Sequence, residues 1–359
     1  MLARRLLLPL AFSTAACALL TSFDGFDEPK TQRDDGGSLE LDAGVEAASS
    51  CHKQVPDPPR TGGSSKNAGS FVAAARSMTF VGSPGFDLDV ACTCPAPASC
   101  RGAKPDQPCD ADGGVDNAAA DLFAFASVFL DGGLDESGLA LGLSRGRYGL
   151  LFKIDGWNGE RNDDAVAVSF ANAFDVVPEG AGARFDGSDV WRVDEESYIP
   201  NSTIPAYPAE SWVKDGVLVA RFVRLPLKLR IPTVNDRWLL LPVAIEDATM
   251  SARLEAGGGG VTLTKGELGG RLSMASVFRI IQSVGGCLEP ASATTPAIGS
   301  NLCARRDIML ASKDDNRDLG CDALSVGIAF EATPAKVADT PGVPTDEAPC
   351  ASGVLPTCP

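Results

Sequence analysis

LLFKIDGWNGERNDDAVAVSF, residues 150–170, is the stretch that decides the fold. Apolar side chains alternate with other residues at both of its ends, at Leu150, Phe152 and Ile154 and again at Val166, Val168 and Phe170. A period of two residues places successive apolar side chains on the same face of a strand. The stretch therefore predicts a β-hairpin with a long polar tip and one buried face.

Strand patterns recur through the rest of the chain. The same alternation appears at residues 225–231, 250–254 and 324–330, and residues 217–223 and 238–245 are more continuously apolar. Helical periodicity is limited to residues 118–130 and 272–284, each followed by a pair of glycines. Many short strands with few helices predict a mainly β fold, an antiparallel β-sandwich or jelly-roll-like body with one or two helices.

Composition divides the chain into four segments. After an export segment at residues 1–16, residues 17–69 are rich in Asp, Glu, Gly, Ser and Pro and predict a flexible acidic tether. Residues 70–331 carry the strand patterns and form the expected globular body. Residues 332–359 are Pro-rich and contain two cysteines, so we expect a tail that disulfides hold to the body.

The export segment reads MLARRLLLPLAFSTAAC, a basic start, a short apolar run and small residues before Cys17. It resembles the lipobox of bacterial lipoproteins, and the whole layout resembles uncharacterised envelope lipoproteins of myxobacterial type. The resemblance implies that Cys17 is lipidated and anchors the protein in a membrane of the cell envelope. Ala18 in the position after the lipidated cysteine implies the outer membrane.

Charge and cysteine content narrow the possible partners. The formal charge is -16, which argues against nucleic acid as a partner because phosphate binding needs clustered Lys and Arg. If Cys17 carries lipid, the other ten of the 11 cysteines can pair as disulfides, with a connectivity that the sequence leaves open. Four-thiolate zinc is the alternative for one group, Cys92, Cys94, Cys100 and Cys109.

The motif for a serine hydrolase is incomplete. Residues 142–146, GLSRG, match the nucleophile-elbow pattern, but the only histidine is His52 in the predicted tether. We therefore read GLSRG as a turn before a strand and expect no enzyme. A glycan hydrolase that works through two carboxylates is the alternative function, and the 47 acidic residues alone cannot test it.

Acidic residues gather on predicted loops and suggest a calcium site. Calcium takes six to eight oxygen ligands, which carboxylates and turn carbonyls can supply. One group comprises Asp87, Asp89, Asp110, Asp112 and Asp116, which flank the segment with four cysteines, and a second comprises Asp155, Asn158, Asn162, Asp163 and Asp164. We expect Ca²⁺ at the first group; the alternative is that these are solvated loop residues.

Aromatic residues suggest a ligand-binding face. Exposed rings beside amides pack on the apolar faces of sugars, and the candidates are Trp157, Asn158, Trp191 and Trp212. The alternative is that the rings fill the core. The sequence thus predicts a lipid-anchored cell-envelope binding or structural module that is calcium-stabilised and binds glycans.

Overall fold

The computed structural model describes residues 53–60, 69–90, 99–102, 110–123, 136–203, 205–232, 238–257, 260–283, 295–342 and 355–358. The export segment, Cys17 and the tether up to His52 lie outside the described residues. So do several cysteines for which disulfides are expected, namely Cys51, Cys92, Cys94, Cys109, Cys287 and Cys350.

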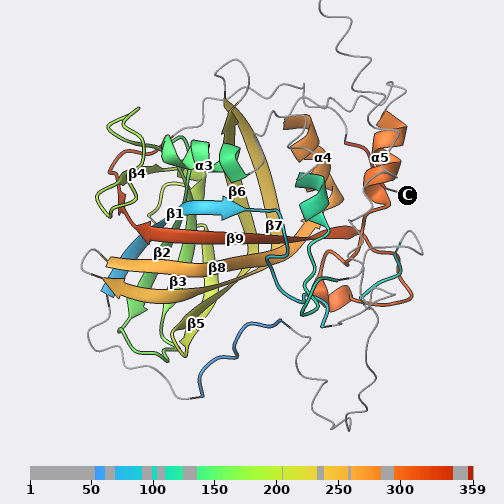
Figure 1. The fold of residues 1–359 in the computed structure, drawn as a ribbon, viewed down its shortest axis with the longest axis horizontal. Coiled ribbons are helices and arrows are strands. Elements are labelled where there is room, and N and C mark those ends of the chain that lie inside the picture. Colours follow the sequence, from blue (N-terminus) through green and yellow to red (C-terminus); the bar gives the residue numbers. More distant parts are fainter. Residues whose placement is uncertain are drawn as a thin grey trace, which may run out of the picture.

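Eight antiparallel strands form one sheet that closes on itself (Figure 1). They follow the chain order around the ring: β1 (Gly69–Thr79), β2 (Gly149–Trp157), β3 (Ala167–Val177), β5 (Tyr207–Lys214), β6 (Val217–Pro232), β7 (Trp238–Gly257), β8 (Gly260–Ser273) and β9 (Ala323–Pro334). Pairing of β3 with β5 and of β9 with β1 completes the ring. Two short strands, β4 (Val190–Val193) and β10 (Lys336–Val337), continue outward from β3. The predicted mainly β, antiparallel body is confirmed.

The inside of the closed sheet is the hydrophobic core. The predicted hairpin is present, with Phe152 opposite Phe170 and Ile154 opposite Val168. The Phe152 ring stacks on Phe330 of β9, with centroids 5.0 Å apart. Side chains of β2 and β9, the two strands that flank β1, therefore pack against each other inside the closed sheet, and the period of two residues places the apolar side chains there.

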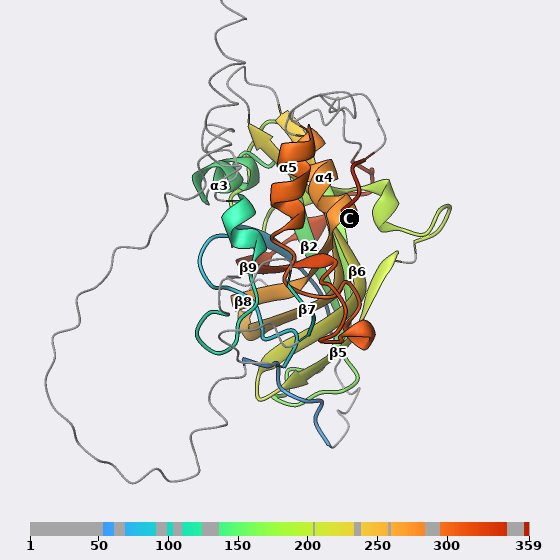
Figure 2. The same ribbon diagram turned by 90° about the vertical axis from the view of Figure 1, so that its right-hand side faces the viewer.

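Helices lie around one end of the sheet (Figures 1 and 2). They are α3 (Glu136–Ser144), α4 (Met274–Ser283) and α5 (Thr295–Cys303). The described residues also contain two short 3₁₀ turns, η3 (Glu195–Ser197) and η4 (Ser312–Asp314), and a helical stretch at residues 119–123. Residues 124–130 of the first predicted helix are not described. The second begins at Met274 because Leu272 still pairs with β9. The expected one or two helices are thus too few, since α3 and α5 were missed.

None of the helices in the described ranges has the length and apolar composition needed to cross a bilayer.

Residues 142–146, interpreted from the sequence as a turn before a strand, contain the end of α3 and then the turn into β2. Near the C-terminus, Cys303 of α5 and Cys358 form a disulfide, which joins residues 355–358 to α5.

Residues 53–60, which belong to the predicted tether, lie on the body. Lys53 donates its backbone N–H to Gly113 (2.7 Å) and its ammonium group to Glu267 of β8 (2.6 Å). Trp212 of β5 donates its indole N–H to the carbonyl oxygen of Pro56 (2.9 Å). Composition alone indicated a flexible segment here, but these long-range contacts fix it to the outer face of the sheet.

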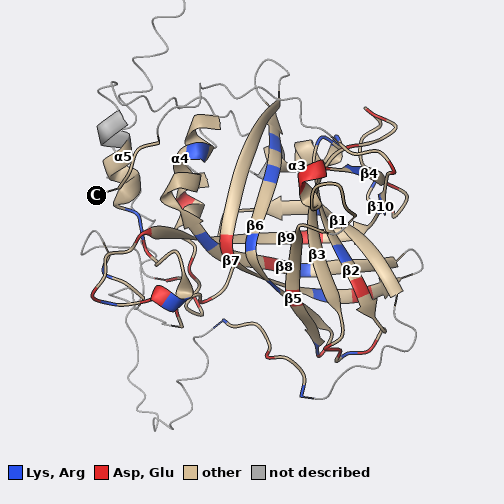
Figure 3. Ribbon diagram, turned by 180° about the vertical axis from the view of Figure 1, so that it is seen from behind, with Lys and Arg blue, Asp and Glu red and all other residues tan. Residues whose placement is uncertain are grey.

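Charged side chains on the strands are largely paired. Figure 3 shows basic residues along β6 and acidic residues in the surrounding loops. On β6, Arg224 lies 3.2 Å from Glu246, and the Lys228 ammonium group lies 2.6 Å from the carboxylates of both Asp194 and Glu196. This strand is therefore not a free basic surface.

Glycines let a loop lie directly on the outer face of β8 and β9. A Cβ atom on Gly327 of β9 would come 1.8 Å from the carbonyl oxygen of Pro84, and one on Gly269 of β8 would come 2.9 Å from the Phe86 ring. Real Cβ atoms do not approach backbone this closely. The side-chain-free surface therefore positions residues 84–86, which lead directly into Asp87 and Asp89.

We expect Gly327→Ala to lower the free energy of unfolding by about 1–3 kcal/mol, because the backbone of Pro84 must move away from the new methyl group. Urea unfolding measures the loss. Gly299→Ala in α5 is the control, since no atom lies within 4 Å of the new Cβ, and it should be neutral or slightly stabilising. Equal stability of the two variants would contradict the close packing of residues 84–86 on the sheet.

Candidate metal site

Three aspartates converge on the outer side of the sheet. The carboxylate oxygens of Asp87, Asp89 and Asp116 all lie within 4.8 Å of one another, one oxygen from each residue. Asp87 is 2% exposed and Asp116 is 6% exposed, while Asp89 is half-buried. Three converging oxygen ligands of this kind could hold a metal ion.

Backbone hydrogen bonds bring the two acidic segments together. The N–H of Leu88 donates to the Asp116 carboxylate (2.7 Å), and the N–H of Asp116 donates to the carbonyl oxygen of Phe86 (3.1 Å). The N–H of Ser99 donates to the Asp89 carboxylate at 3.2 Å. The carboxylates are therefore positioned by three separate stretches of chain.

Asn117 fastens the second segment to β9. Its side-chain oxygen accepts the N–H of Gly327 (2.9 Å), and its amide group donates to the carbonyl oxygen of Pro84 (3.3 Å). The Asn117 side chain therefore joins the loop at residues 82–84 to the sheet. Asp116, next in the chain, is held in place by the same contacts.

The environment of Asp116 favours the protonated carboxyl. Burial, together with the negative charges of Asp89 and Asp110, raises the pKa of Asp116 to about 9. Asp307 adds a further negative charge, and burial raises its own pKa to about 7 in spite of hydrogen bonds from Ser325. Without a cation, this part of the molecule holds protons that ordinary surface carboxyls release.

A buried arginine holds both loops that border the group. Arg271 of β8 is 1% exposed, and its guanidinium group donates to the carbonyl oxygens of Leu88 (3.0 Å) and Met309 (2.7 Å). Asp315 balances its charge through two hydrogen bonds, at 2.8 and 3.2 Å. Because Leu88 lies between Asp87 and Asp89, Arg271 fixes the backbone of that pair.

The first predicted acidic group is only partly assembled. The structure brings Asp87, Asp89 and Asp116 together, and Asp110 lies near enough for its charge to act on Asp116. Asp112 is exposed in a turn and is not part of the group of three. Asp307 was not predicted; it is distant in sequence, and no local spacing indicates that it approaches the others.

The second predicted acidic group forms turns. Asp163 is fully buried and accepts the backbone N–H groups of Asn158 (3.2 Å) and Ala165 (2.9 Å). The side-chain oxygen of Asn162 accepts the N–H of Asp215, and Asp155 accepts the hydroxyl of Ser70. Within the described ranges, converging metal-ligating side chains occur in threes only at Asp87, Asp89 and Asp116.

The expectation that the tryptophan rings are exposed is wrong. Trp157 is 7% exposed, and its indole N–H donates to the carbonyl oxygen of Glu160. Trp191 of β4 is fully buried, and its ring packs on Gly149 of β2. Trp212 is 2% exposed because residues 53–60 cover it, and the Arg221 guanidinium group lies 5.1 Å from its ring centroid. Asn158 also belongs to a turn, since its side chain accepts the N–H of Glu160. These residues do not form an open sugar-binding face.

A groove of about 430 Å³ lies beside the acidic group, on the outer face of β5 to β8. Asp87 is one of its lining residues, together with Gln54, Glu210, Arg221, Val223 and Asp247. The lining is mostly polar and includes charges of both signs. The candidate metal site therefore adjoins the groove.

Comparison of the chain with protein-family models, with curated proteins and with solved structures finds no match. The described structure contains three converging carboxylates, of which two are buried and one is half-buried, a nearby groove and a disulfide-linked framework.

The raised pKa of Asp116 predicts a pH dependence of stability. The pKa of Asp in the unfolded chain is about 3.9, so between that pH and about 9 the folded state holds a proton on Asp116 that the unfolded state has released. The stability that this proton contributes is fully present below about pH 3.9 and is lost as the pH rises toward 9. Between pH 5 and 8, without metal, we expect wild type to lose about 1 kcal/mol per pH unit relative to Asp116→Asn, measured by urea unfolding in EDTA. Asp112→Asn, the control, should follow wild type. A difference between wild type and Asp116→Asn that is constant with pH would contradict the prediction.

Proposed function

We propose that this protein is a lipid-anchored binding or structural module of the cell envelope, whose β body is stabilised by Ca²⁺ at Asp87, Asp89 and Asp116. The observation that carries the metal part is the convergence of these three carboxylates in a largely buried position. A bound cation neutralises charges that otherwise repel one another or require protons. The export segment and Cys17 support the anchored location through their resemblance to a lipobox.

Calcium is the cation that we propose because the ligands are all oxygens. Carboxylate and carbonyl ligands suit hard cations, whereas zinc and copper sites use histidine or thiolates. The carbonyl oxygens of Gly113 and Phe86 accept the backbone N–H groups of Lys53 and Asp116, and these hydrogen bonds join the neighbouring loops. Calcium also tolerates the irregular geometry that loops provide.

The groove is the place where we propose that a ligand binds. Glu210, Arg221 and Asp247 provide donors and acceptors for hydroxyl groups, which is the chemistry that a glycan needs. The burial of Asp87 and Asp116 argues against these two carboxyls as the catalytic pair of a glycan hydrolase, since both catalytic carboxyls of such an enzyme must reach the glycosidic bond. A non-catalytic module therefore fits the site better.

Calcium is expected to raise the melting temperature. At a hundredfold excess over the dissociation constant, binding to the folded state alone adds about 2.7 kcal/mol, which is a shift of about 5–10 °C for a domain of this size. Thermal melts in CaCl₂ and in EDTA measure the shift. Asp112→Asn should retain it and Asp116→Asn should lose most of it. Identical wild-type melts in the two solutions, in a sample shown to be free of metal, would refute the calcium site.

Lipidation is tested separately at Cys17. Acyl chains contribute about 0.8 kcal/mol per buried methylene, and several chains together hold a protein on a bilayer. Cys17→Ser should therefore move the protein from the membrane fraction to the soluble fraction, as measured by fractionation at high salt. Retention of the variant in the membrane pellet would show that another part of the chain provides the attachment.

A further inference from the structure

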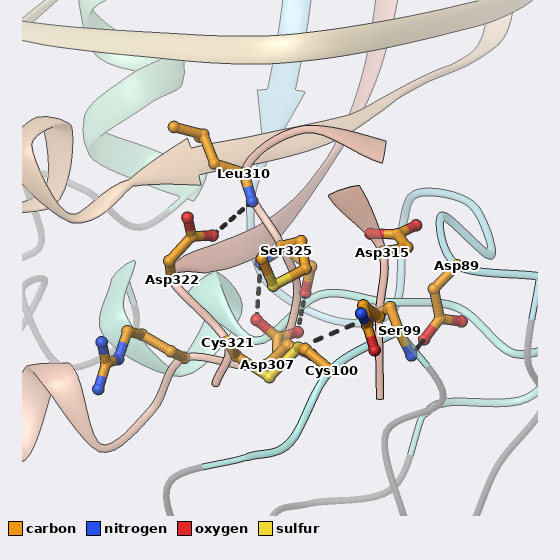
Figure 4. The surroundings of a disulfide bond; sticks show 12 residues. Asp89, Ser99, Cys100, Asp307, Leu310, Asp315, Cys321, Asp322 and Ser325 are labelled. Atoms are coloured by element: carbon orange, nitrogen blue, oxygen red, sulfur yellow. Dashed lines mark hydrogen bonds between the residues drawn. A yellow bond between two sulfur atoms is a disulfide. The ribbon is translucent and has the colours of Figure 1, made fainter. Parts of the chain in front are cut away.

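The disulfide between Cys100 and Cys321 lies beside the acidic group (Figure 4). The two cysteines are 221 residues apart and are 1% and 3% exposed. Their bond joins residues 99–102 to the segment at residues 305–322, which also contains Asp307 and Asp315. It therefore connects two parts of the chain that both border the candidate metal site.

Residues 99–102 contribute directly to the site. Ser99, next to the disulfide, donates its N–H to the Asp89 carboxylate at 3.2 Å. On the other side of Cys100, Arg101 donates its N–H to Leu319 (2.6 Å) and accepts the N–H of Cys321 (3.1 Å). The position of the Ser99 donor thus depends on contacts that are centred on the disulfide.

The segment at residues 305–322 is held to the sheet independently of the disulfide. Arg271 binds Met309 and Asp315, and the Asp307 carboxylate accepts the hydroxyl and, at 2.9 Å, the N–H of Ser325 on β9. Asp322 accepts the N–H of Leu310 at 2.6 Å. If the disulfide opens, the segment at 305–322 stays in place and residues 99–102 lose their covalent attachment to it.

We propose that this disulfide is a redox switch for the acidic group: while Cys100 and Cys321 are bonded, it anchors Ser99, whose N–H orients the Asp89 carboxylate, and its reduction leaves residues 99–102 held to residues 319–321 only by the backbone hydrogen bonds of Arg101. This inference rests on the proposed metal site. A dithiol supplies two electrons and two protons, which give two cysteine thiols while the dithiol becomes a disulfide. Asp89 then loses the Ser99 hydrogen bond, and the group loses affinity for a divalent cation. The affinity for the cation is therefore higher when Cys100 and Cys321 are bonded than when they are reduced.

The matched experiment compares two double variants of the full chain, Cys100→Ser with Cys321→Ser and Cys303→Ser with Cys358→Ser. Loss of a partner that orients a metal ligand lowers metal affinity by about 10- to 100-fold. We expect such a loss of Ca²⁺ affinity, measured by calorimetry, in the first double variant. The second removes the disulfide between α5 and residues 355–358 and should retain the wild-type affinity. Equal affinity in wild type and both variants would overturn the switch.

A second readout does not depend on metal. The backbone amides of Ser99 and Arg101 should exchange hydrogen faster in the Cys100/Cys321 variant than in wild type and at the wild-type rate in the other double variant. Unchanged exchange would show that residues 99–102 are held without the disulfide, which would overturn the switch. If wild type binds no Ca²⁺ but exchange does accelerate, the proposed calcium site fails and the control of residues 99–102 by the disulfide stands.

A third variant applies if the first double variant does not fold. Ser99→Pro keeps both cysteines but removes the N–H that donates to Asp89. It should weaken Ca²⁺ binding, whereas Ser99→Ala, which keeps the N–H, should bind like wild type. Wild-type affinity in Ser99→Pro would show that this hydrogen bond does not position Asp89, and the proposed switch would be wrong.

Discussion

The pairing of β3 with β5 is the contact on which the rest of the structure depends, because it turns an open sheet into a closed one. Beyond the start of β5, Asn172 of β3 continues the closure: its amide donates to the carbonyl oxygen of Pro226 and its side-chain oxygen accepts the N–H of Lys228, both at 2.8 Å. A single side chain thus takes the place of strand pairing between β3 and β6. Closure removes two open edges and encloses the apolar face that includes Phe152, Phe170 and Phe330.

Because the core is enclosed, the candidate metal site and the groove lie on the outer face of the sheet. The absence of side chains at Gly269 and Gly327 brings residues 84–86 against β8 and β9, and Arg271 ties the adjoining Leu88 to the loop that contains Met309. These contacts concentrate carboxylates where burial and mutual repulsion disfavour their charges. A divalent cation bound here would neutralise these charges, which supports the proposed metal site.

The extent to which the sequence predicts this structure differs from region to region. The hairpin at residues 150–170 is predictable because its period of two residues is a local property. Closure is not, since Asn172 stands in a mostly apolar strand and its partners, Pro226 and Lys228, lie more than 50 residues further along the chain. Asp87, Asp89 and Asp116 could be grouped from the sequence because they flank one short cysteine-rich segment, whereas Arg271 and Asp307 come from strands and loops that no local pattern relates to it. The burial of Trp212 was missed because the segment that covers it, residues 53–60, has the composition of a linker.

The most direct test of the central claim is to locate a cation by anomalous diffraction from crystals of the metal-free protein soaked with terbium, a hard trivalent substitute for calcium. The account predicts a strong peak about 2.3–2.6 Å from carboxylate oxygens of Asp87, Asp89 and Asp116. Crystals that show terbium only at exposed surface carboxylates, with no peak at this group, would contradict it.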